Sequence, residues 1–290
     1  MSARVTQPTP YPDVNTLLHV LLSSVQTVLG THFIGMYLYG SLASGDFDPQ
    51  CSDIDFVVVT ADELPDEMLS ALEAMHARMA ASGLKWATTL EGSYIPQHAL
   101  RRYDPTHARH PAIRLGESFH VEQHDSDWVI QRYIIREQGV VVAGPAPQTL
   151  IDPIQPNDLR RAVLRILQEW WSTMLHDPAR LHGTGYQAYA ILTMCRVLYT
   201  LHYGIVVSKP VAARWAQEAL GERRAALIER AFLAWRHGAQ FDNVDETQDF
   251  IRYTLERSQQ FEIPITIRKN LSAPRRLAAR HHPTTPSHHA

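Results

Sequence analysis

The chain has 290 residues, of which 45% are hydrophobic, and a formal net charge of -3 at pH 7. This length is enough for two ordinary domains or one large one, and the near-neutral charge gives no basic surface that would favour a nucleic-acid partner. No apolar run is long enough to span a bilayer, and the first residues lack a charged-then-apolar secretion signal, so we expect a cytoplasmic protein without a membrane partner.

The first half of the chain alternates between helical and strand-like patterns. Apolar residues at helical spacing predict a helix over residues 13–29, with Asp13 as its N-cap, and a second helix over residues 64–83 that is ended by Gly83. A third helix is predicted over residues 126–138. The predicted strands are residues 33–39, 53–60, 86–96, 118–123 and 139–144. This pattern indicates an α/β domain with a mixed sheet.

The pattern of predicted elements changes at residues 144–156. This segment is rich in Pro and Gly and indicates a domain boundary. Only helical patterns follow, roughly over residues 156–176, 185–203, 208–220, 222–237 and 245–261. The predicted organisation is therefore an α/β domain over residues 1–150 and an all-α helical bundle domain over residues 151–265. Residues 266–290 are polar, contain Pro and several His, and are predicted to be a disordered tail.

Two acids lie one residue apart at the start of an apolar strand, Asp53 and Asp55 in "SDIDFVVVT". Side chains at positions i and i+2 of a strand point to the same face, so these carboxylates converge. Two carboxylates that close repel each other unless a cation lies between them. Oxygen ligands at this charge density suit Mg²⁺, which usually also binds phosphate oxygens of a substrate.

A short polar loop precedes the acids. Gly40 and Ser41 follow the strand-like residues 33–39, and glycine lets the backbone approach a ligand closely while Ser41 supplies a hydroxyl and an amide. This arrangement would hold a phosphate if a helix begins there. Ser52 is placed to add a second hydroxyl.

The stretch "GSLASGDFDPQCSDIDFVVV", residues 40–59, resembles the signature of the DNA polymerase β-like nucleotidyltransferases. In that superfamily a Gly-Ser and an Asp-x-Asp hold the triphosphate of a nucleotide and two Mg²⁺ ions, and a third acid comes from a neighbouring strand. The candidate for this acid is Glu91, the one acid in residues 86–96. Its alternative role is an ordinary surface Glu on an edge strand.

The resemblance extends into the second half. Residues 188–216, "AYAILTMCRVLYTLHYGIVVSKPVAARWA", look like the helical domain of bacterial aminoglycoside nucleotidyltransferases that adenylylate streptomycin and spectinomycin. In that family the helical domain closes the nucleotide site of a single chain, so a monomer is expected. The positions that match its nucleotide contacts are Arg196, Lys209 and Tyr253. The Arg and Lys would neutralise phosphate charge during transfer.

The activity that this resemblance implies is Mg²⁺-dependent transfer of AMP from ATP to a hydroxyl of an aminoglycoside or aminocyclitol antibiotic, which gives resistance and releases pyrophosphate. Asp53 and Asp55 would hold Mg²⁺, and Glu91 would help to bind metal and take the proton from the acceptor hydroxyl. Two alternatives stay open: transfer to another small hydroxyl compound or a protein side chain, and a catalytically silent nucleotide-binding protein. The three acids argue against the silent protein, because a binding module needs no base.

The acceptor pocket departs from the family pattern. The streptomycin-type enzymes supply carboxylates from the segment before the helix that contains the nucleotide-binding Arg. Here only Asp177 is acidic in that segment, and His182 and Tyr186 stand where acids are expected. Asp177 is either an acceptor ligand or a turn residue before Pro178. Tyr186, with the two tryptophans at residues 170–171, either stacks on the acceptor or belongs to the core.

Two further features have open interpretations. His120, Glu122 and His124 alternate, which on a strand would form a polar face near the acceptor pocket or a zinc site. Asp152 lies in the proposed linker, where it either caps the linker or contacts the nucleotide.

Overall fold

The structure, a computed structural model, describes residues 7–183, 185–239 and 241–261. The chain divides into two compact units between Ile154 and Gln155, and each unit is described by itself below. The tail predicted over residues 266–290 lies outside the described residues. Among the helices of the described ranges, none combines the length and the apolar character that a membrane crossing requires.

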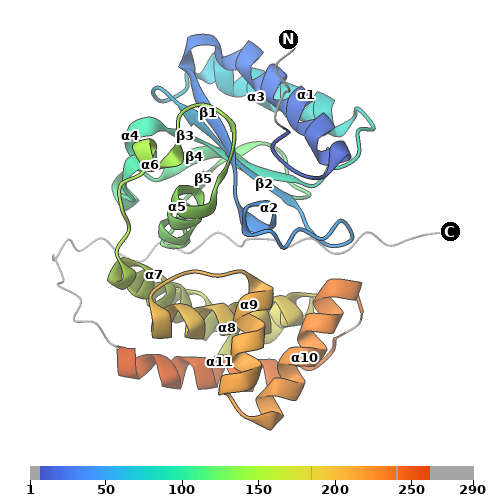
Figure 1. The fold of residues 1–290 in the computed structure, drawn as a ribbon, viewed down its shortest axis with the longest axis vertical. Coiled ribbons are helices and arrows are strands. Elements are labelled where there is room, and N and C mark those ends of the chain that lie inside the picture. Colours follow the sequence, from blue (N-terminus) through green and yellow to red (C-terminus); the bar gives the residue numbers. More distant parts are fainter. Residues whose placement is uncertain (1–6, 184, 240, 262–290) are drawn as a thin grey trace. The chain divides into compact units, whose positions relative to one another are not determined.

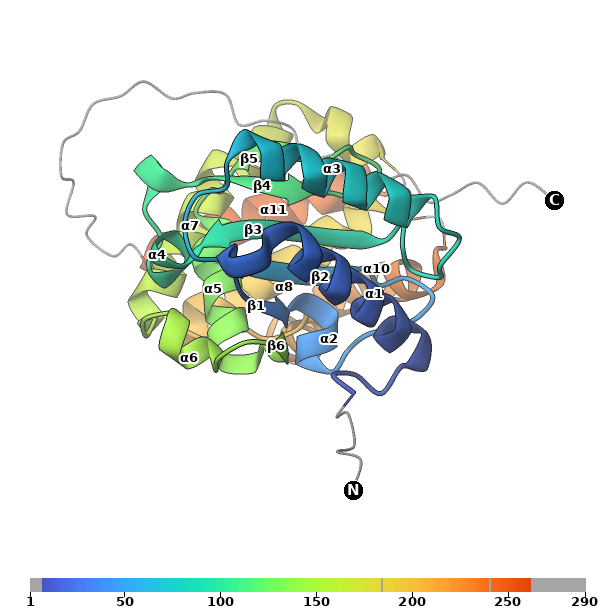
Figure 2. The same ribbon diagram turned by 90° about the horizontal axis from the view of Figure 1, so that it is seen from above.

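The first unit is built on a six-stranded mixed sheet with the order β5-β4-β3-β2-β1-β6 (Figures 1 and 2). Its strands are β1 (Phe33–Leu38), β2 (Ile54–Thr60), β3 (Leu90–Pro96), β4 (Arg109–Ile113), β5 (His120–Gln123) and β6 (Val140–Ala143). Strands β2 and β3 pair in parallel, and the other neighbours pair antiparallel. The predicted α/β class with a mixed sheet is confirmed.

Helices α1 and α3 lie side by side and bury the main core of this unit with one face of the sheet (Figure 2). The helices of the unit are α1 (Pro12–Leu29), α2 (Gly40–Ser44), α3 (Asp66–Ala80), α4 (Gln97–Arg101), α5 (Asp127–Gln138) and α6 (Pro147–Leu150). Phe56 and Val58 of β2 belong to this core. Because strand side chains alternate, Asp55 and Val57 point to the opposite face of the sheet.

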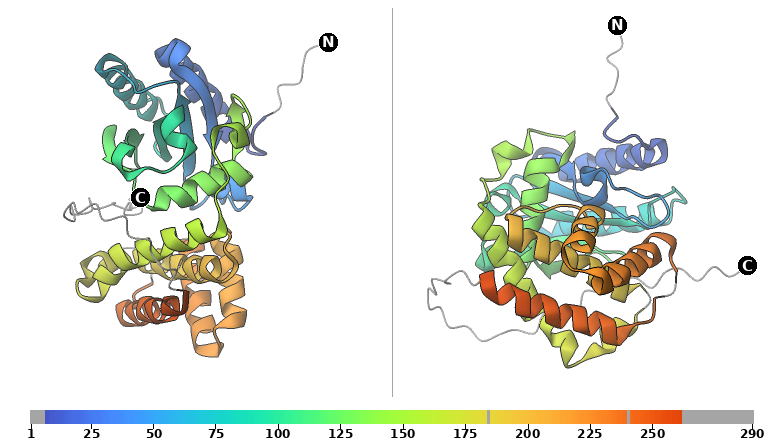
Figure 3. Two further views of the ribbon diagram at one scale, coloured as in Figure 1. Left: turned by 90° about the vertical axis from the view of Figure 1, so that its left-hand side faces the viewer. Right: turned by 60° about the horizontal axis from the view of Figure 1, so that its bottom comes forward.

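The second unit consists of helices, as predicted (Figure 3). They are α7 (Pro156–Glu169), α8 (Tyr186–Tyr203), α9 (Lys209–Ala219), α10 (Glu222–His237) and α11 (Val244–Ser258), with short 3-10 turns between α7 and α8. Helix α8 packs against α7, α9, α10 and α11. It is the central helix of the unit because it is apolar on nearly every side.

Several predicted helix boundaries were wrong by a few residues. Helix α1 begins at Pro12 with Tyr11 as N-cap, because proline is favoured in the first helical position; Asp13 lies in the first turn and pairs with Lys85 at 2.9 Å. Helix α3 ends at Ala80 rather than at Gly83.

Two elements of the sheet differ from the prediction. Strand β3 begins only at Leu90, since residues 86–89 form a turn. Strand β4 was not predicted, because Pro111 within it cannot donate to a ladder. Its pairing with β3 is accordingly short and ends at Ala112, opposite Ser93.

Candidate active site

Three carboxylates meet at one end of strands β2 and β3. Asp53, Asp55 and Glu91 each offer one oxygen, and these oxygens all lie within 4.8 Å of one another. Asp55 and Glu91 are paired neighbours on the two parallel strands, and Asp53 lies just before β2. All three side chains are partly buried. A cluster of this charge is costly without a cation, and its oxygen donors are those that Mg²⁺ prefers.

The backbone at Gly40 is pressed against this cluster. Gly40 has φ +62, and a Cβ built on it would lie 1.8 Å from Asp55 Oδ2. Immediately before it, the backbone N–H of Tyr39 donates to the carbonyl oxygen of Asp55 at 3.1 Å. Only glycine fits this position, and the chain turns there into helix α2.

The Ser41 hydroxyl has no hydrogen-bond partner among the described residues, although its oxygen is buried. A buried hydroxyl without a partner is costly, and one that follows directly on the Gly40 turn fits a ligand that accepts a hydrogen bond. Ser52 is engaged differently: its hydroxyl accepts from the backbone N–H of Asp48 at 2.9 Å and closes the loop.

Tyr39 and Arg114 also belong to this site, although neither is among the residues predicted for it. Tyr39 is buried. Its burial, and to a smaller extent the negative charge of Asp55, hold the pKa of its phenol well above the usual value. Burial lowers the pKa of Arg114, but Tyr39 and Glu122 more than offset this and raise it overall, so Arg114 is a permanent cation. The position of Tyr39 directly before Gly40 was a usable signal, whereas nothing in the sequence marked Arg114.

The alternating residues His120, Glu122 and His124 do not form a zinc site. Glu122 pairs with Arg114, and His124 lies beyond the end of β5, buried, with its ring stacked on Trp128 at 3.8 Å. Burial lowers the pKa of His124 to about 3, so its ring is neutral. Over the described parts of the chain, the acid cluster above is the one group found that could hold a metal ion.

Asp152 is not a cap, so that interpretation was wrong. Its carboxylate pairs with Arg101 at 3.0 Å and with Arg102. Helix α7 is capped instead by Gln155, in a capping box with Asp158. Asp152 binds these two exposed arginines instead of a helix end, because hydrogen bonds between charged groups are stronger than neutral ones.

Arg196 and Lys209 lie on neighbouring helices of the second unit. Arg196 is on α8 and half-buried between apolar neighbours. Lys209 opens α9, and its Nζ lies 5.0 Å from the ring centroid of Tyr189 and 5.1 Å from that of Trp235. Two aromatic faces thus hold the ammonium in place.

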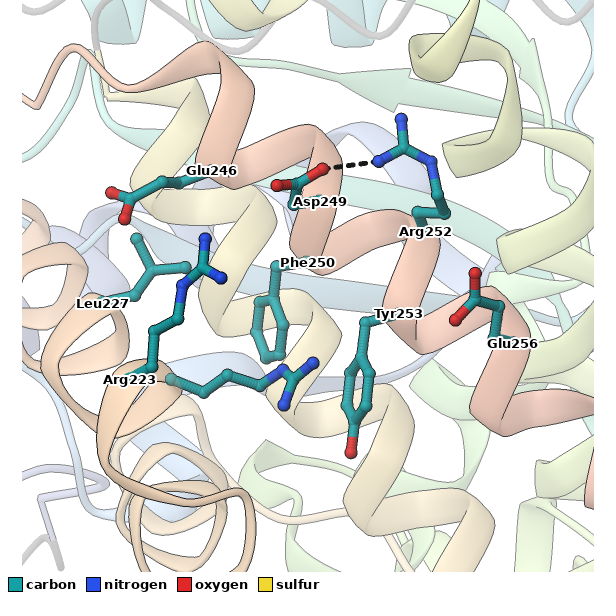
Figure 4. A pocket seen from close by; sticks show the side chains of 9 residues that line it. Arg223, Leu227, Glu246, Asp249, Phe250, Arg252, Tyr253 and Glu256 are labelled. Carbon is teal, nitrogen blue, oxygen red and sulfur yellow. Dashed lines mark hydrogen bonds and ion pairs between the residues drawn. The ribbon is translucent and has the colours of Figure 1, made fainter.

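Tyr253 lies on α11 in a cavity of about 320 Å³ between α10 and α11 (Figure 4). The Arg224 guanidinium lies 3.6 Å from its ring centroid, and Arg223 lines the same cavity. Figure 4 shows the Asp249–Arg252 pair beside them. The structure thus gives Tyr253 a cation–π partner on α10, and its contact with a nucleotide stays a prediction.

The three candidate acceptor residues have different surroundings: one caps a turn, one is buried in the core and one is exposed. Asp177 accepts from the backbone N–H of Ala179 at 3.1 Å and caps a 3-10 turn. Tyr186 is buried, its hydroxyl accepts from Trp170 Nε1 at 3.2 Å, and its ring lies 6.0 Å from that of the buried Trp171. His182 is exposed. Tyr186 and Trp171 are therefore core residues of this unit.

Two family models match the chain, in the order of its two units. The nucleotidyltransferase domain matches residues 25–88, and the C-terminal domain of aminoglycoside adenylyltransferase matches residues 149–258. Together they cover more than half of the chain. The first contains the Gly40 turn and the Asp53–Asp55 pair, and the second contains Arg196, Lys209 and Tyr253.

Curated relatives match over most of the chain. An aminoglycoside (3'') (9) adenylyltransferase from Escherichia coli is 24% identical over 258 residues, which cover 83% of this chain and 93% of that protein. A spectinomycin 9-adenylyltransferase from Staphylococcus aureus is 26% identical over 227 residues, covering 74% of this chain and 82% of that protein.

A solved structure shares the fold. The spectinomycin adenyltransferase from Enterococcus faecialis, crystallised with ATP and spectinomycin, superposes with a TM-score of 0.65 at 21% identity, covering 84% of this chain and 98% of that one. The fold, the two matched models and the named relatives agree with the family predicted from the sequence. The chain is an adenylyltransferase-type enzyme and belongs to the aminoglycoside adenylyltransferases, nucleotidyltransferases that carry a helical C-terminal domain.

Proposed function

We propose that this enzyme transfers AMP from ATP to a hydroxyl of an aminoglycoside or aminocyclitol antibiotic and releases pyrophosphate. The observation that carries the proposal is the cluster of Asp53, Asp55 and Glu91, whose oxygens lie within 4.8 Å of one another beside the Gly40 turn. The antibiotic acceptor is supported by the relatives, whose names give aminoglycosides and spectinomycin as their substrates.

The residues of this site are suited to bind Mg²⁺ and the phosphates of a nucleoside triphosphate. The three carboxylates supply oxygen donors, and the buried Ser41 hydroxyl without a partner, next to the Gly40 turn, supplies a donor for a phosphate oxygen. We propose that Asp53, Asp55 and Glu91 hold two Mg²⁺ ions, which when bound supply charge stabilisation to the attacking and leaving oxygens.

The proposed chemistry of the chain's own residues follows from this arrangement. Glu91 accepts the proton of the acceptor hydroxyl, whose oxygen forms a bond to the α-phosphorus of ATP in line with the bond to pyrophosphate, which breaks. Ser41 and the backbone N–H groups at the start of α2 donate to phosphate oxygens. Most of the rate comes from positioning and from charge neutralisation, because the transferred group carries spread negative charge.

The second unit contributes cations in this proposal. Arg196 and Lys209 neutralise phosphate charge, and Tyr253 contacts the nucleotide, as the family resemblance implies. The two rings beside Lys209 support its part, because they order a side chain that otherwise loses much entropy on binding.

A second acceptor class is favoured by one observation. The only acid before helix α8 in the segment that supplies carboxylates in streptomycin-type enzymes is Asp177, and its carboxylate caps a turn. A strongly cationic acceptor would find little negative charge there. Transfer to a less cationic small hydroxyl compound is therefore the alternative.

Pyrophosphate release tests both. Purified protein receives ATP and Mg²⁺ with streptomycin, spectinomycin, other aminoglycosides and uncharged polyols, and Asp53→Asn is the blank. We expect release with at least one antibiotic and none from the blank. Release with polyols alone would establish the alternative, and no release with any acceptor while ATP still binds would contradict catalysis.

The role of Glu91 gives a separate prediction. Glu91→Gln keeps the size and polarity of the side chain but cannot take a proton. We expect kcat to fall about 10²–10⁴-fold, the usual contribution of a general base, while the Kd for ATP in equilibrium dialysis changes less than about threefold. A variant with near-wild-type kcat would show that another group is the base.

A further inference from the structure

A row of four polar side chains crosses the sheet at the carboxylate cluster. Leu38 pairs with Phe56 and Asp55 with Glu91, and Gly92 pairs with Ile113 on the antiparallel strand β4. If each register is continued by one residue, Tyr39, directly after β1, comes opposite Asp55, to whose carbonyl oxygen its N–H donates at 3.1 Å, and Arg114, directly after β4, comes opposite Glu91. Directly opposed residues share a face of a sheet, so the row reads Tyr39, Asp55, Glu91, Arg114.

Arg114 is held from its outer side. Its Nε donates to Glu122 Oε2 at 3.2 Å, and its Nη2 donates to Glu122 Oε1 and to Ser93 Oγ, the latter at 3.4 Å. The side chains of Arg114 and Glu122 are only 14% and 15% exposed. This two-point contact fixes the plane of the guanidinium on the face that carries Glu91.

A buried ion pair such as Arg114–Glu122 adds little to stability by itself. Burying two charges costs about as much as their attraction returns, and well-packed apolar residues often do as well. Arg114 is, however, the cation of a row that holds two of the three clustered carboxylates. Its place beside Glu91 therefore calls for a functional reason.

We propose that Arg114, clamped by Glu122, is a positioning residue whose charge offsets that of the carboxylate cluster and thereby keeps Glu91 available to the acceptor hydroxyl. The proposal rests on the transfer activity proposed above for its kinetic part, and on the acid cluster alone for its metal-binding part. Through this charge, Arg114 opposes complete capture of Glu91 by a metal ion and leaves the carboxylate able to act as a base.

The kinetic test is a double-mutant cycle of Arg114→Met and Glu91→Gln. Arg114→Met removes the charge and keeps most of the volume. We expect it to lower kcat at least tenfold with KM for ATP nearly unchanged, and to lower kcat less than threefold further once Glu91 is Gln. Equal losses in both backgrounds would overturn the proposal, because Arg114 would then act independently of Glu91.

A matched control and a rescue variant separate this effect from misfolding. Arg132 is also buried, but it donates to the carbonyl oxygens of Ala99, Leu100 and Trp128, away from the cluster. Arg132→Met is expected to lower Tm without coupling to Glu91→Gln. Arg114→Lys, which keeps the charge, is expected to restore at least tenfold of the kcat lost in Arg114→Met; no restoration would contradict a role for charge.

Manganese binding tests the proposal without turnover. Mn²⁺ alone is titrated into the full chain and free ion is followed by electron paramagnetic resonance, with Asp53→Asn to identify the site. We expect Arg114→Met to bind Mn²⁺ severalfold more tightly than wild type and Arg132→Met to bind as wild type does. Equal affinities in both arginine variants would overturn the proposal even if no acceptor is found, whereas an inactive enzyme that shows this difference would refute only the transfer activity.

Discussion

At the scale of single residues, the site depends on one position where a side chain is impossible. Gly40 combines a left-handed φ of +62 with a contact in which a Cβ would lie 1.8 Å from Asp55 Oδ2. Gly45, five residues later, has φ +76 but nothing within 4 Å of the same built atom. The two glycines therefore share a backbone requirement and differ in their distance from the carboxylates.

This pair predicts a separation of stability from activity. Gly45→Ala should cost about 1 kcal/mol of unfolding free energy from left-handed strain, with kcat/KM within about twofold of wild type. Gly40→Ala should add a displacement of Asp55 and lower kcat/KM about 10²-fold, as a shift of about 1 Å in a reacting group does. Urea denaturation and pyrophosphate release measure the two quantities. Equal activity in both variants would show that the Gly40 contact is irrelevant to catalysis.

At the scale of elements, the pairing of strands places the acids. Strands β2 and β3 run parallel in a register that sets Asp55 beside Glu91, and the antiparallel β4 continues the row to Arg114. In the second unit the 3-10 turn over Pro178–His182 uses Asp177 as its N-cap. Asp177 thus has the turn role, which is one of the two roles that its sequence position allowed.

Asp177 gives a prediction at this scale, because capping needs an oxygen and acceptor binding needs a charge. Asp177→Asn keeps the capping oxygen, so we expect both stability and acceptor KM to stay within error of wild type. Asp177→Ala removes the cap and should cost about 1 kcal/mol. Thermal unfolding and steady-state kinetics check both. A tenfold rise of acceptor KM in Asp177→Asn would assign Asp177 to the acceptor instead.

At the scale of the whole molecule, three buried histidines make stability depend on pH. Burial lowers the pKa of His76 and of His110 to about 4, and that of His124 to about 3. An unfolded histidine titrates near 6.5 and so takes up its proton first as the pH falls. Stability is therefore independent of these groups above about pH 6.5 and is lost as the pH falls from there toward 4.

His76 allows this to be measured. It is a buried residue of α3, and its Nε2 lies 2.7 Å from the hydroxyl of Tyr94 on β3. Its contribution should be lost at about 1.4 kcal/mol per pH unit, or roughly 2 kcal/mol between pH 6.5 and pH 5. His76→Phe should be less stable at pH 7, because the Tyr94 hydroxyl loses its partner, yet show a shallower decline by that amount.

The control is His19→Phe, which removes a histidine from the exposed side of α1 instead of a buried one. Urea denaturation of the full chain between pH 7.5 and 5 gives the slopes. A wild-type slope in His76→Phe would contradict the assigned pKa shift.

Features that depend on local spacing could be predicted from the sequence. The alternation of strands, the helical periods of the second half and the order Gly40, Ser41, Asp53, Asp55 are properties of neighbours along the chain, and each was readable there. Glu91 could be chosen because it is the one acid of its segment. The structure brings it to the Asp pair, and its chemical role stays a prediction.

Features that depend on register between distant segments could be seen only in the folded chain. Arg114 reaches the row because β4 pairs with β3, and that strand was hidden by Pro111. The role of Asp152 was decided in the same way, because its partners Arg101 and Arg102 are distant in the sequence and fold next to it. Sequence spacing states which side chains share a face of one element, whereas a buried charge finds its partner through the packing of several elements.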